Sequence, residues 1–333
     1  MDQRILRFRE DFAVMKAGGV TRPVMATVYP SYGCNFSCPG CHYNVWNEQG
    51  WQFVPVEPLL RRLEEAQSEG LRAVVLSGGG EPLFHKQIEA IVDGVLGLGL
   101  KLGVITNGTA LLRPAGARLR DRLLAEADFV RVSIYPETDL EATLTLAAHP
   151  RNATLGLKFL VGASTVPFYL GAMDVLRDAR WDYIEVKAER GSADDLSQSA
   201  EGKWAANIER HFHTLSPLVK GSLAKLEAPA VRCYLTPVHF VIDAVGAFLL
   251  CCFFQDRKQE HTFGQLSDPE SFHDMWHGAR HRAAREAIDM HLCSKWDCRF
   301  FGYLEISEAA LADRAPAAEK LLRPEFDNDQ VFI

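Results

Sequence analysis

Short apolar runs alternate with amphipathic stretches through much of this chain. Six apolar runs are predicted strands: Val24–Tyr29, Ala73–Ser77, Leu102–Thr106, Phe129–Ile134, Leu155–Val161 and Tyr183–Val186. The stretches between them are predicted helices: Pro58–Gln67, His85–Leu96, Arg118–Ala125, Leu140–Ala147 and Leu170–Asp178. Strands that alternate with helices predict βαβ units and a parallel sheet. The predicted fold class is therefore α/β.

A different pattern follows the polar, connector-like residues 191–232. Val238–Asp243 and Ala247–Cys251 are two predicted strands around a turn, and a helix is predicted from about Ser271 through residues 280–287. We therefore expect a helical lead-in at residues 1–23, a first domain at 24–210, a small α+β domain at 211–304 and a tail at 305–333.

Composition narrows the class of protein. The chain has 333 residues, 47% of them hydrophobic and 24% charged, so it can bury a full core. Its net charge of -7, without a long basic run, argues against a nucleic-acid partner. The N-terminus lacks the apolar core of a signal peptide, and the run Val238–Phe254 is interrupted and short for a membrane span. We expect a cytoplasmic protein without a membrane partner, whose eight cysteines are metal ligands in a reducing compartment.

Cys34, Cys38 and Cys41 form a C-x-x-x-C-x-x-C group just after the first predicted strand. Three close thiolates without a fourth suit an iron–sulfur cluster that leaves one iron open to a substrate or cosubstrate. A zinc site would need a fourth ligand, for which His42 is badly placed. A disulfide framework does not suit a long chain without a secretory signal, and chance clustering is the remaining alternative.

This triad resembles the signature of the radical S-adenosylmethionine (SAM) superfamily. In that family three cysteines hold a 4Fe-4S cluster, SAM binds the fourth iron, and reductive cleavage of SAM yields a 5'-deoxyadenosyl radical that abstracts a hydrogen. The resemblance implies a partial (β/α)6 TIM-like barrel with its chemistry at the carboxyl ends of the strands. It also implies an electron donor of the flavodoxin or ferredoxin type. One departure is Gly40, where the family often has an aromatic residue.

Further elements at the strand ends resemble the SAM pocket of this family. The segment Ser77–Pro82 is either a plain turn or a bare backbone that a ligand approaches closely, and its Gly79, Gly80 and Glu81 resemble the G-G-E element that binds the SAM amino group. Thr106 and Asn107 belong to a segment that resembles the T-N-G element bordering the same pocket. A plain turn is again the alternative.

The fourth, fifth and sixth predicted strands add polar candidates. Ser133 resembles the serine of a V-S-I-D element that holds the SAM carboxylate or ribose, although Tyr135 replaces the acid. Lys158 either pairs with the SAM carboxylate or is a solvated charge. Lys187 and Glu189 are candidates for acid–base work on the substrate, with a surface salt bridge as the alternative.

A second cysteine group follows the connector. Cys233, Gly246 and Cys251 resemble the C-x(9–15)-G-x(4)-C opening of twitch and SPASM extensions, and residues 274–276 resemble their acidic–apolar–tryptophan element. A full SPASM extension carries seven cysteines and two clusters, so the resemblance implies a smaller, twitch-like domain here. It implies one auxiliary 4Fe-4S cluster, and a four-cysteine zinc site is the alternative. The implied ligands are Cys233, Cys251, Cys293 and Cys298. The remaining Cys252 is either a small buried hydrophobe or a hydrogen-atom donor.

An auxiliary cluster within reach of a substrate radical, together with a base, would convert a hydroxyl-bearing carbon to a carbonyl. Only 33 residues precede Cys34, too few for an independently stable leader-binding domain, which favours a small molecule over a peptide. We therefore expect an oxidoreductase that dehydrogenates a polar metabolite, such as a sugar or aminocyclitol, in natural product biosynthesis. The alternatives are an epimerase using Cys252, a peptide-modifying enzyme, a non-enzymatic iron–sulfur redox sensor and an iron-free zinc protein.

Overall fold

The structure is a computed structural model. It describes residues 14, 17, 19–38, 41, 43, 50–162, 165–188, 219–222, 233–252 and 258–295. The tail expected at residues 305–333, most of the lead-in and most of the connector lie outside these residues.

All the strands predicted before the connector form. They are β1 Met25–Val28, β4 Ala73–Leu76, β5 Lys101–Thr106, β6 Phe129–Ile134, β7 Thr154–Val161 and β8 Tyr183–Ala188. Each pairs in parallel with the next, with Met25 opposite Ala73 and Ser133 opposite Lys158. Every residue of β4 is buried, as expected for a parallel strand covered on both faces.

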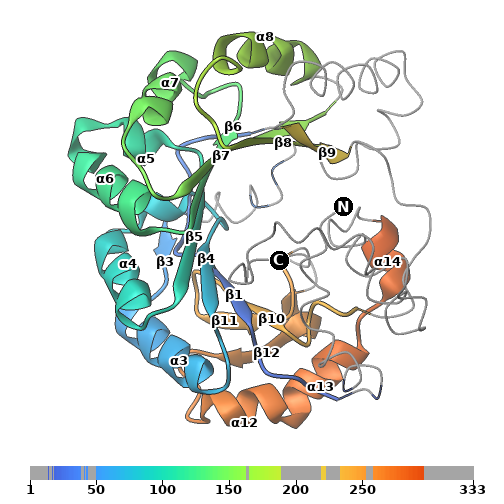
Figure 1. Ribbon diagram of the computed structural model, residues 1–333. Coiled ribbons are helices and arrows are strands. Elements are labelled where there is room, and N and C mark those ends of the chain that lie inside the picture. The colour runs from blue at the N-terminus through green and yellow to red at the C-terminus, as the bar shows by residue number, and fades with distance from the viewer. Residues whose placement is uncertain are drawn as a thin grey trace, which may run out of the picture.

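Helices connect these strands and cover the outer face of the curved sheet (Figure 1). They are α3 Val56–Ser68, α4 Ile88–Gly97, α5 Thr109–Leu112, α6 Ala117–Glu126, α7 Leu140–Ala148 and α8 Val166–Leu176. Helix α3 buries Leu59, Leu63 and Ala66, which helical periodicity places on one face. Asp139 caps α7, since its carboxylate accepts a 2.9 Å hydrogen bond from the Ala142 amide. The predicted partial barrel is confirmed.

The sheet extends beyond the predicted barrel at both edges. Strand β9, Val219–Ser222, pairs in parallel with β8, and β10, His239–Ile242, pairs in parallel with β1. The antiparallel strands β11, Ala247–Leu249, and β12, Thr262–Gln265, complete the order β12-β11-β10-β1-β4-β5-β6-β7-β8-β9. The predicted hairpin of the second cysteine group thus forms as β10 and β11, and it is hydrogen-bonded directly to the barrel sheet.

A single helix is predicted from about Ser271 through residues 280–287. That prediction is wrong in one respect, because two helices form there instead of one. Helix α12, Phe272–His277, ends at Gly278, and α13, Ala279–Glu286, begins after it. The backbone of Gly278 is extended, and a Cβ at this position would lie 2.4 Å from the Asp274 carbonyl oxygen. The chain therefore turns at Gly278 instead of continuing one helix.

Smaller elements complete the described residues. A short antiparallel ladder joins β2 Ser31–Tyr32 to β3 Gln52–Phe53, and single 3-10 turns form at η2 Pro82–Phe84 and η3 Pro114–Gly116. Two short helices, α11 Lys258–His261 and α14 Met290–Lys295, flank β12, α12 and α13 in sequence. No helix among the described residues is long and apolar enough to cross a membrane.

The two faces of the sheet have different chemistry. Val130, Val132 and Ile134 of β6 belong to the main core cluster, which also contains buried residues of the covering helices. On the opposite, inner face, a small apolar cluster of Met25, Ala73 and Val75 packs with Ile105 and Phe129. Farther along β6, the inner-face positions are the polar residues Arg131 and Ser133. The inner face is thus most polar toward the carboxyl ends of the strands, where barrels of this kind place their chemistry.

Candidate active site

The loop after β1 and β2 brings three thiols together. Cys38 is buried and Cys34 and Cys41 are half-buried, and the Cys41 amide donates a 3.3 Å hydrogen bond to the Cys38 carbonyl. Cys34 and Cys41 interact electrostatically, and Cys38 interacts with both. The structure therefore brings these predicted ligands together at the carboxyl end of β1.

Burial of these thiols opposes their ionisation, so a bound metal would have to stabilise the thiolates. Burial raises the pKa of Cys34 to about 11, and burial likewise raises the pKa of Cys38 far above its usual range. Thiols that bind a metal must lose their protons, and the positive charge of iron stabilises the thiolate. The Cys34 sulfur already accepts hydrogen bonds from the Phe36 amide at 3.4 Å and from the Asn107 side-chain amide at 3.7 Å. The residues present fit a cluster held by three cysteines.

Gly79 and Gly80 have a packing role that the sequence did not predict. A Cβ on Gly80 would lie 1.9 Å from the Gly33 carbonyl oxygen, and one on Gly79 would lie 2.4 Å from the Tyr32 ring. The Gly80 amide donates to the Ser31 carbonyl at 2.8 Å, and the Glu81 amide donates to the Gly33 carbonyl at 2.9 Å. The bare backbone after β4 thus lies against the segment that leads into the cysteine triad.

Glu81 is a buried carboxylate at the end of β4. One oxygen accepts from the Thr106 hydroxyl at 2.5 Å and from the Leu83 amide at 3.1 Å, and the other accepts from the Asn107 amide at 2.8 Å. Burial raises the pKa of Glu81 to about 7, against the opposing effect of these hydrogen bonds. The G-G-E and T-N-G segments, separate in sequence, are therefore joined through this side chain.

Asn107 continues this network to the triad. Its side-chain amide donates to the Asn35 side-chain oxygen at 2.9 Å as well as to the Cys34 sulfur, and its own oxygen accepts from the Thr109 amide at 3.0 Å. The Asn35 amide in turn donates to the Thr109 hydroxyl at 3.1 Å. The turn after β5 is thus fastened to the loop that carries Cys34.

Ser133 and Lys158 lie side by side on β6 and β7. Both are buried, so the alternative of Lys158 as a solvated surface charge is excluded. The Lys158 ammonium lies 3.8 Å from a carboxylate oxygen of Glu185 on β8, and the Arg131 guanidinium donates to the same oxygen at 3.0 Å. Arg131 and Glu185 were missed from the sequence, although both occupy inner-face positions of predicted strands.

The remaining barrel candidates are less fully described. Lys187 lies in β8, opposite Leu160 of β7 and Ser222 of β9, and its side chain falls outside the described part of the chain. Glu189 lies wholly outside the described residues.

The second cysteine group surrounds the β10–β11 hairpin. Cys233 precedes β10, Cys251 follows β11, and Cys293 belongs to α14. Cys251 and Cys293 are buried in the main core cluster, against which Cys233 and Cys252 also pack. Cys298 lies outside the described residues.

Gly246 explains the spacing within this group. It adopts a left-handed φ of 83°, which favours glycine, in the turn between β10 and β11. Asp243 stabilises the same turn, because its carboxylate accepts from the amides of Val245 at 3.0 Å and Ala247 at 2.8 Å. The turn at Gly246 thus begins β11, Ala247–Leu249, which ends just before Leu250 and Cys251.

Tyrosines connect the two cysteine groups, and sequence reasoning missed them. The Tyr43 hydroxyl lies 3.0 Å from that of Tyr29 and donates to the Cys252 carbonyl at 3.2 Å. Burial raises the pKa of Tyr43, and the charges of Cys252, Cys41 and Cys251 raise it further. Tyr43 therefore lies between the triad loop and the end of β11.

A second tyrosine contact lies beside the first. The Tyr32 hydroxyl donates to the buried Asp243 carboxylate at 3.1 Å, and Lys258 forms an ion pair with the same carboxylate. The Lys258 ammonium also lies 5.5 Å from the centre of the Tyr32 ring. The segment just before Cys34 is thereby held to the auxiliary hairpin.

Comparison with known proteins assigns both parts of the chain. Residues 28–188 match the radical SAM superfamily, and residues 233–299 match the SPASM iron–sulfur cluster-binding domain.

An S-adenosylmethionine-dependent nucleotide dehydratase of Selenomonas ruminantium is 28% identical over 106 residues, which is 30% of this chain and 35% of that protein. A 7-carboxy-7-deazaguanine synthase of Hyperthermus butylicus is 29% identical over 116 residues, 34% of this chain and 46% of that protein. Matches to curated relatives span from 35% to 64% of the relative's length.

Among solved structures, one of Streptococcus suis SuiB bound to precursor peptide SuiA is similar to this chain, with a TM-score of 0.61 and 14% sequence identity. The match covers 97% of this chain and 79% of the SuiB chain. At this identity the likeness shows the fold. SuiB also has a structure bound to S-adenosylmethionine. The chain belongs to the radical SAM superfamily and carries a SPASM-type domain, with 4Fe-4S clusters and SAM as its cofactors.

Proposed function

We propose that this radical SAM enzyme oxidises a small polar metabolite, such as a sugar or aminocyclitol, by loss of a hydrogen atom, a proton and one electron. The observation that carries the proposal is the position of Tyr43 between Cys41 and the Cys251–Cys252 pair. An auxiliary cluster bound through Cys251 would be next to the loop that holds the SAM cluster. A substrate radical formed between the two clusters could then pass its electron to the auxiliary cluster.

The proposed cluster ligands follow from the two cysteine groups. Cys34, Cys38 and Cys41 would hold the SAM cluster, and Cys233, Cys251, Cys293 and Cys298 would hold one auxiliary cluster. When bound, the first cluster with SAM supplies a hydrogen-abstracting radical, and the second supplies a one-electron acceptor.

The residues at the strand ends would bind and orient SAM. Gly79, Gly80, Thr106, Asn107 and Ser133 are the proposed pocket contacts. The Glu81 carboxylate would attract the SAM ammonium group, and a cation there would favour its ionised form. Lys158, buried on the inner face, would attract the SAM carboxylate.

Proton removal falls to Lys187 or Glu189 in this proposal. Glu185 is a weaker candidate, because its carboxylate is already paired with Arg131 and Lys158. Reducing electrons would come from a donor of the flavodoxin or ferredoxin type.

Two observations support a small polar substrate. The inner face near the strand ends carries Arg131, Lys158 and Glu185, which suit a polar ligand better than an apolar one. Two curated relatives, a nucleotide dehydratase and a 7-carboxy-7-deazaguanine synthase, are likewise named for small molecules.

The first experiment tests the chemistry before the substrate. The protein is reconstituted anaerobically, reduced and mixed with SAM, and 5'-deoxyadenosine is measured beside a triple Cys34→Ala, Cys38→Ala, Cys41→Ala variant. Wild type alone should form 5'-deoxyadenosine, with about eight irons per chain from two four-iron clusters. If neither protein forms 5'-deoxyadenosine although wild type carries an intact, reducible cluster, the proposal of an enzyme is overturned in favour of a redox sensor. A low iron content with bound zinc would instead support the zinc protein.

A substrate panel then tests the proposed class. Sugars, aminocyclitols and nucleotides are compared with peptides for stimulation of 5'-deoxyadenosine formation. The expected product is a carbonyl compound two mass units lighter than the substrate. Stimulation by peptides alone would overturn the metabolite proposal in favour of peptide modification.

An epimerase is the second candidate, because Cys252 is half-buried and interacts electrostatically with Tyr29 and Tyr43. In that reaction the thiol would return a hydrogen atom to the substrate radical. The Cys252→Ala variant should keep turning over if the enzyme is a dehydrogenase, and should stall after abstraction if it is an epimerase. Incorporation of solvent deuterium into unoxidised product would identify the epimerase independently.

A further inference from the structure

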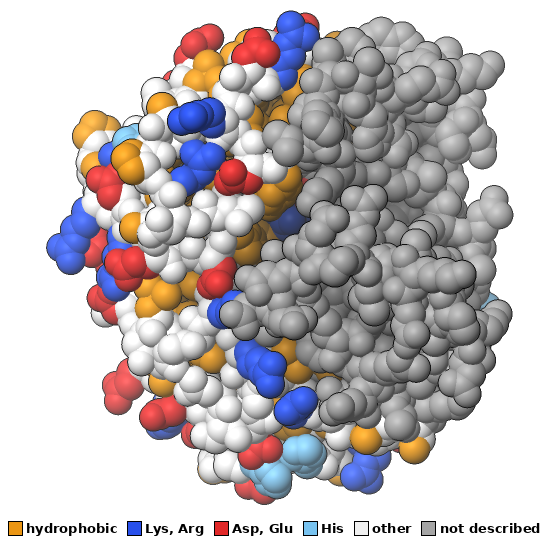
Figure 2. Space-filling model, in the orientation of Figure 1, with side chains coloured by type: hydrophobic (Ala, Val, Ile, Leu, Met, Phe, Trp, Pro, Cys, Tyr) orange, Lys and Arg blue, Asp and Glu red, His pale blue; other side chains and the backbone are white. Residues whose placement is uncertain are grey.

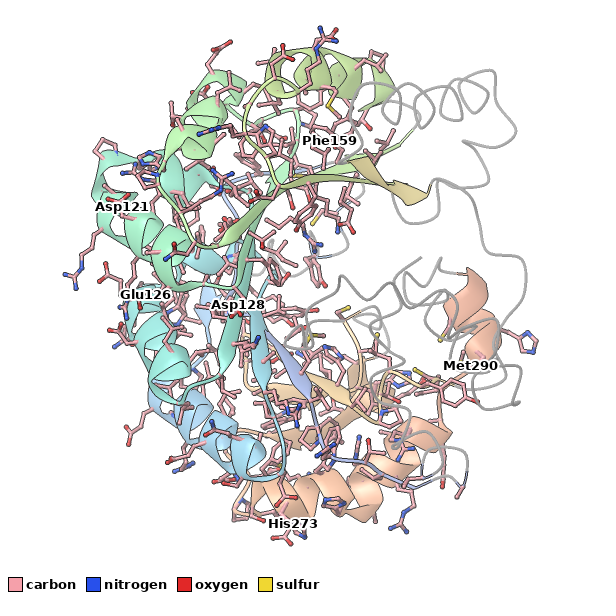
Figure 3. All side chains as sticks on the ribbon, viewed as in Figure 1. Asp121, Glu126, Asp128, Phe159, His273 and Met290 are labelled. Carbon is pink, nitrogen blue, oxygen red and sulfur yellow. The ribbon has the colours of Figure 1, made fainter. Side chains whose placement is uncertain are left out.

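A cluster of two histidines and a glutamate lies on the outer surface where α3 meets α12. Glu69 is the C-cap residue just after α3, and His273 and His277 lie one helical turn apart on α12. One Glu69 carboxylate oxygen is 3.1 Å from Nδ1 of His273, and the other is 3.4 Å from Nε2 of His277. His273 projects away from the sheet (Figure 3), and histidine side chains meet acidic ones at the lower edge of the surface (Figure 2).

We propose that Glu69, His273 and His277 form a binding site for a divalent cation of the zinc type, separate from the iron–sulfur sites. Imidazole nitrogens and carboxylate oxygens are common zinc ligands, and three protein ligands leave a fourth position for water. Histidines four residues apart on a helix share one face, so both can reach the same ion.

The distances fit such an ion. With zinc–ligand bonds of about 2.0–2.2 Å, a tetrahedral arrangement separates ligand atoms by roughly 3.3–3.6 Å. The two carboxylate–imidazole separations are 3.1 and 3.4 Å, and ligand atoms of all three residues lie within 4.8 Å of one another. Small side-chain rotations therefore suffice to surround one ion.

The two helices are held together without help from the cluster. Arg62 of α3, which is buried, donates to the Glu270 carbonyl at 2.7 Å and also to the Asp268 carbonyl. Glu65 of α3 accepts a 2.8 Å hydrogen bond from the Phe272 amide at the start of α12. The backbones that carry the ligands are thus in place before an ion binds, which lowers the ordering cost of binding.

The two histidines are also accessible. Helix α12 turns Phe272, Met275 and Trp276 inward, where they are buried. The side chains of His273 and His277 are 60% and 39% exposed. An ion can therefore reach them from solvent, and it would link α3 of the radical SAM segment to α12 of the SPASM segment.

The test is a zinc titration of the cluster-loaded, full-length protein under anaerobic conditions, followed by calorimetry and by direct metal analysis. Wild type is compared with the double variant His273→Ala, His277→Ala and with Glu69→Gln. The control is His149→Ala, which removes a histidine that pairs at 4.0 Å with Asp121 and does not belong to the group of candidate metal ligands found among the described residues.

Wild type and His149→Ala should each bind one more zinc per chain than the double variant, and Glu69→Gln should bind that zinc more weakly. Zinc should raise the melting temperature of wild type and leave that of the double variant unchanged. Equal iron content in all variants shows that the clusters and the fold are intact. Equal zinc stoichiometry in wild type and the double variant would overturn the proposal and leave the cluster as ion pairs alone.

Discussion

At the scale of single residues, Glu81 and Asn107 connect the predicted SAM pocket to the predicted cluster ligands. The Glu81 carboxylate accepts from the Asn107 backbone amide, and the Asn107 side chain donates to the Cys34 sulfur. Hydrogen bonds to cluster sulfurs are one of the means by which proteins set reduction potentials. Besides its proposed place in the SAM pocket, Asn107 would therefore influence the cluster through Cys34.

Replacing Asn107 with leucine should make the SAM cluster harder to reduce. Loss of the N–H···S hydrogen bond should lower its midpoint potential by on the order of 60 mV, a tenfold change for a one-electron couple. Redox titration followed by electron paramagnetic resonance measures the potential. Asn152→Leu is the matched control, because that amide donates to the Ala125 carbonyl instead. Equal potentials in wild type and Asn107→Leu would show that the contact with Cys34 has no effect on the cluster.

Glu81 should give the SAM-free, cluster-free protein a pH-dependent stability. Its pKa is about 7 in the folded protein and 4.5 in the reference state, so the folded state binds the proton more tightly. The stabilisation is therefore complete below pH 4.5 and is lost as the pH rises through 7. The side chain in the Glu81→Gln variant stays neutral, so the variant's free energy of unfolding in urea should rise progressively relative to that of wild type as the pH increases, by about 3 kcal/mol in total.

The exposed Glu126→Gln variant serves as the control for this measurement and should show no such trend. A difference between wild type and Glu81→Gln that does not change from pH 4.5 to 7.5 would mean that folding does not raise the pKa of Glu81.

At the scale of elements, the loops after β1 and β4 are built as one unit. Hydrogen bonds join Ser31 to Gly80 and Gly33 to Glu81, and the Ser31 hydroxyl donates to the Glu81 carbonyl at 2.7 Å. At Gly80 the backbone packs directly against the backbone of Gly33, which leaves no space for a side chain. The geometry of the triad loop consequently depends on the glycine segment as well as on its own sequence.

Gly80→Ala should therefore displace the triad loop and impair the SAM cluster. Its Cβ would meet the Gly33 backbone at 1.9 Å, and a backbone contact cannot rotate away. Iron content after reconstitution should fall from about eight to about four per chain, since the auxiliary cluster is left intact. Gly171→Ala, at a helical position with open space around it, should retain full iron. Full iron in Gly80→Ala would show that the loop can shift without losing its cluster.

At the scale of the whole molecule, the SPASM segment and the barrel share one sheet and one core. Strand β10 is paired with β1, and residues of both segments occupy the main core cluster. On the outer side, Arg62 joins α3 to the chain just before α12. The two parts are therefore expected to unfold together.

Arg62→Met should destabilise this junction by about 2–4 kcal/mol, because it leaves Glu65 and two carbonyl oxygens without their charged donor. Urea unfolding of the cluster-free protein measures the loss, and faster hydrogen exchange of α12 amides should accompany it. The neighbouring exposed Arg61→Met should change stability by less than about 0.5 kcal/mol. Unchanged hydrogen exchange of the α12 amides would show that Arg62→Met does not destabilise the junction between α3 and α12.

Much of the fold could be predicted because its signals are local. The apolar runs of the barrel strands and the periodicity of α3 depend on neighbours a few residues apart. Strands β9 and β12 were missed, since Lys220, Gly221 and Gly264 dilute the apolar signal and partner strands supply the stabilisation. The break at Gly278 was missed because the extended conformation of a single residue leaves no periodic signal in the sequence.

The sequence by itself determined the two cysteine groups, the class of fold and the segments that follow each strand, because spacing and periodicity are properties of the chain alone. Only the tertiary structure decided that Tyr43 meets Cys252 across 209 residues, that Tyr32 meets Asp243 across 211, and that Glu81 joins two strand ends. The contacts of Tyr32 and Glu81 arise because parallel pairing brings the carboxyl ends of strands to one edge of a sheet. The contact of Tyr43 with Cys252 depends instead on the antiparallel return of the chain through β11. No local pattern encodes which side chains will then be neighbours.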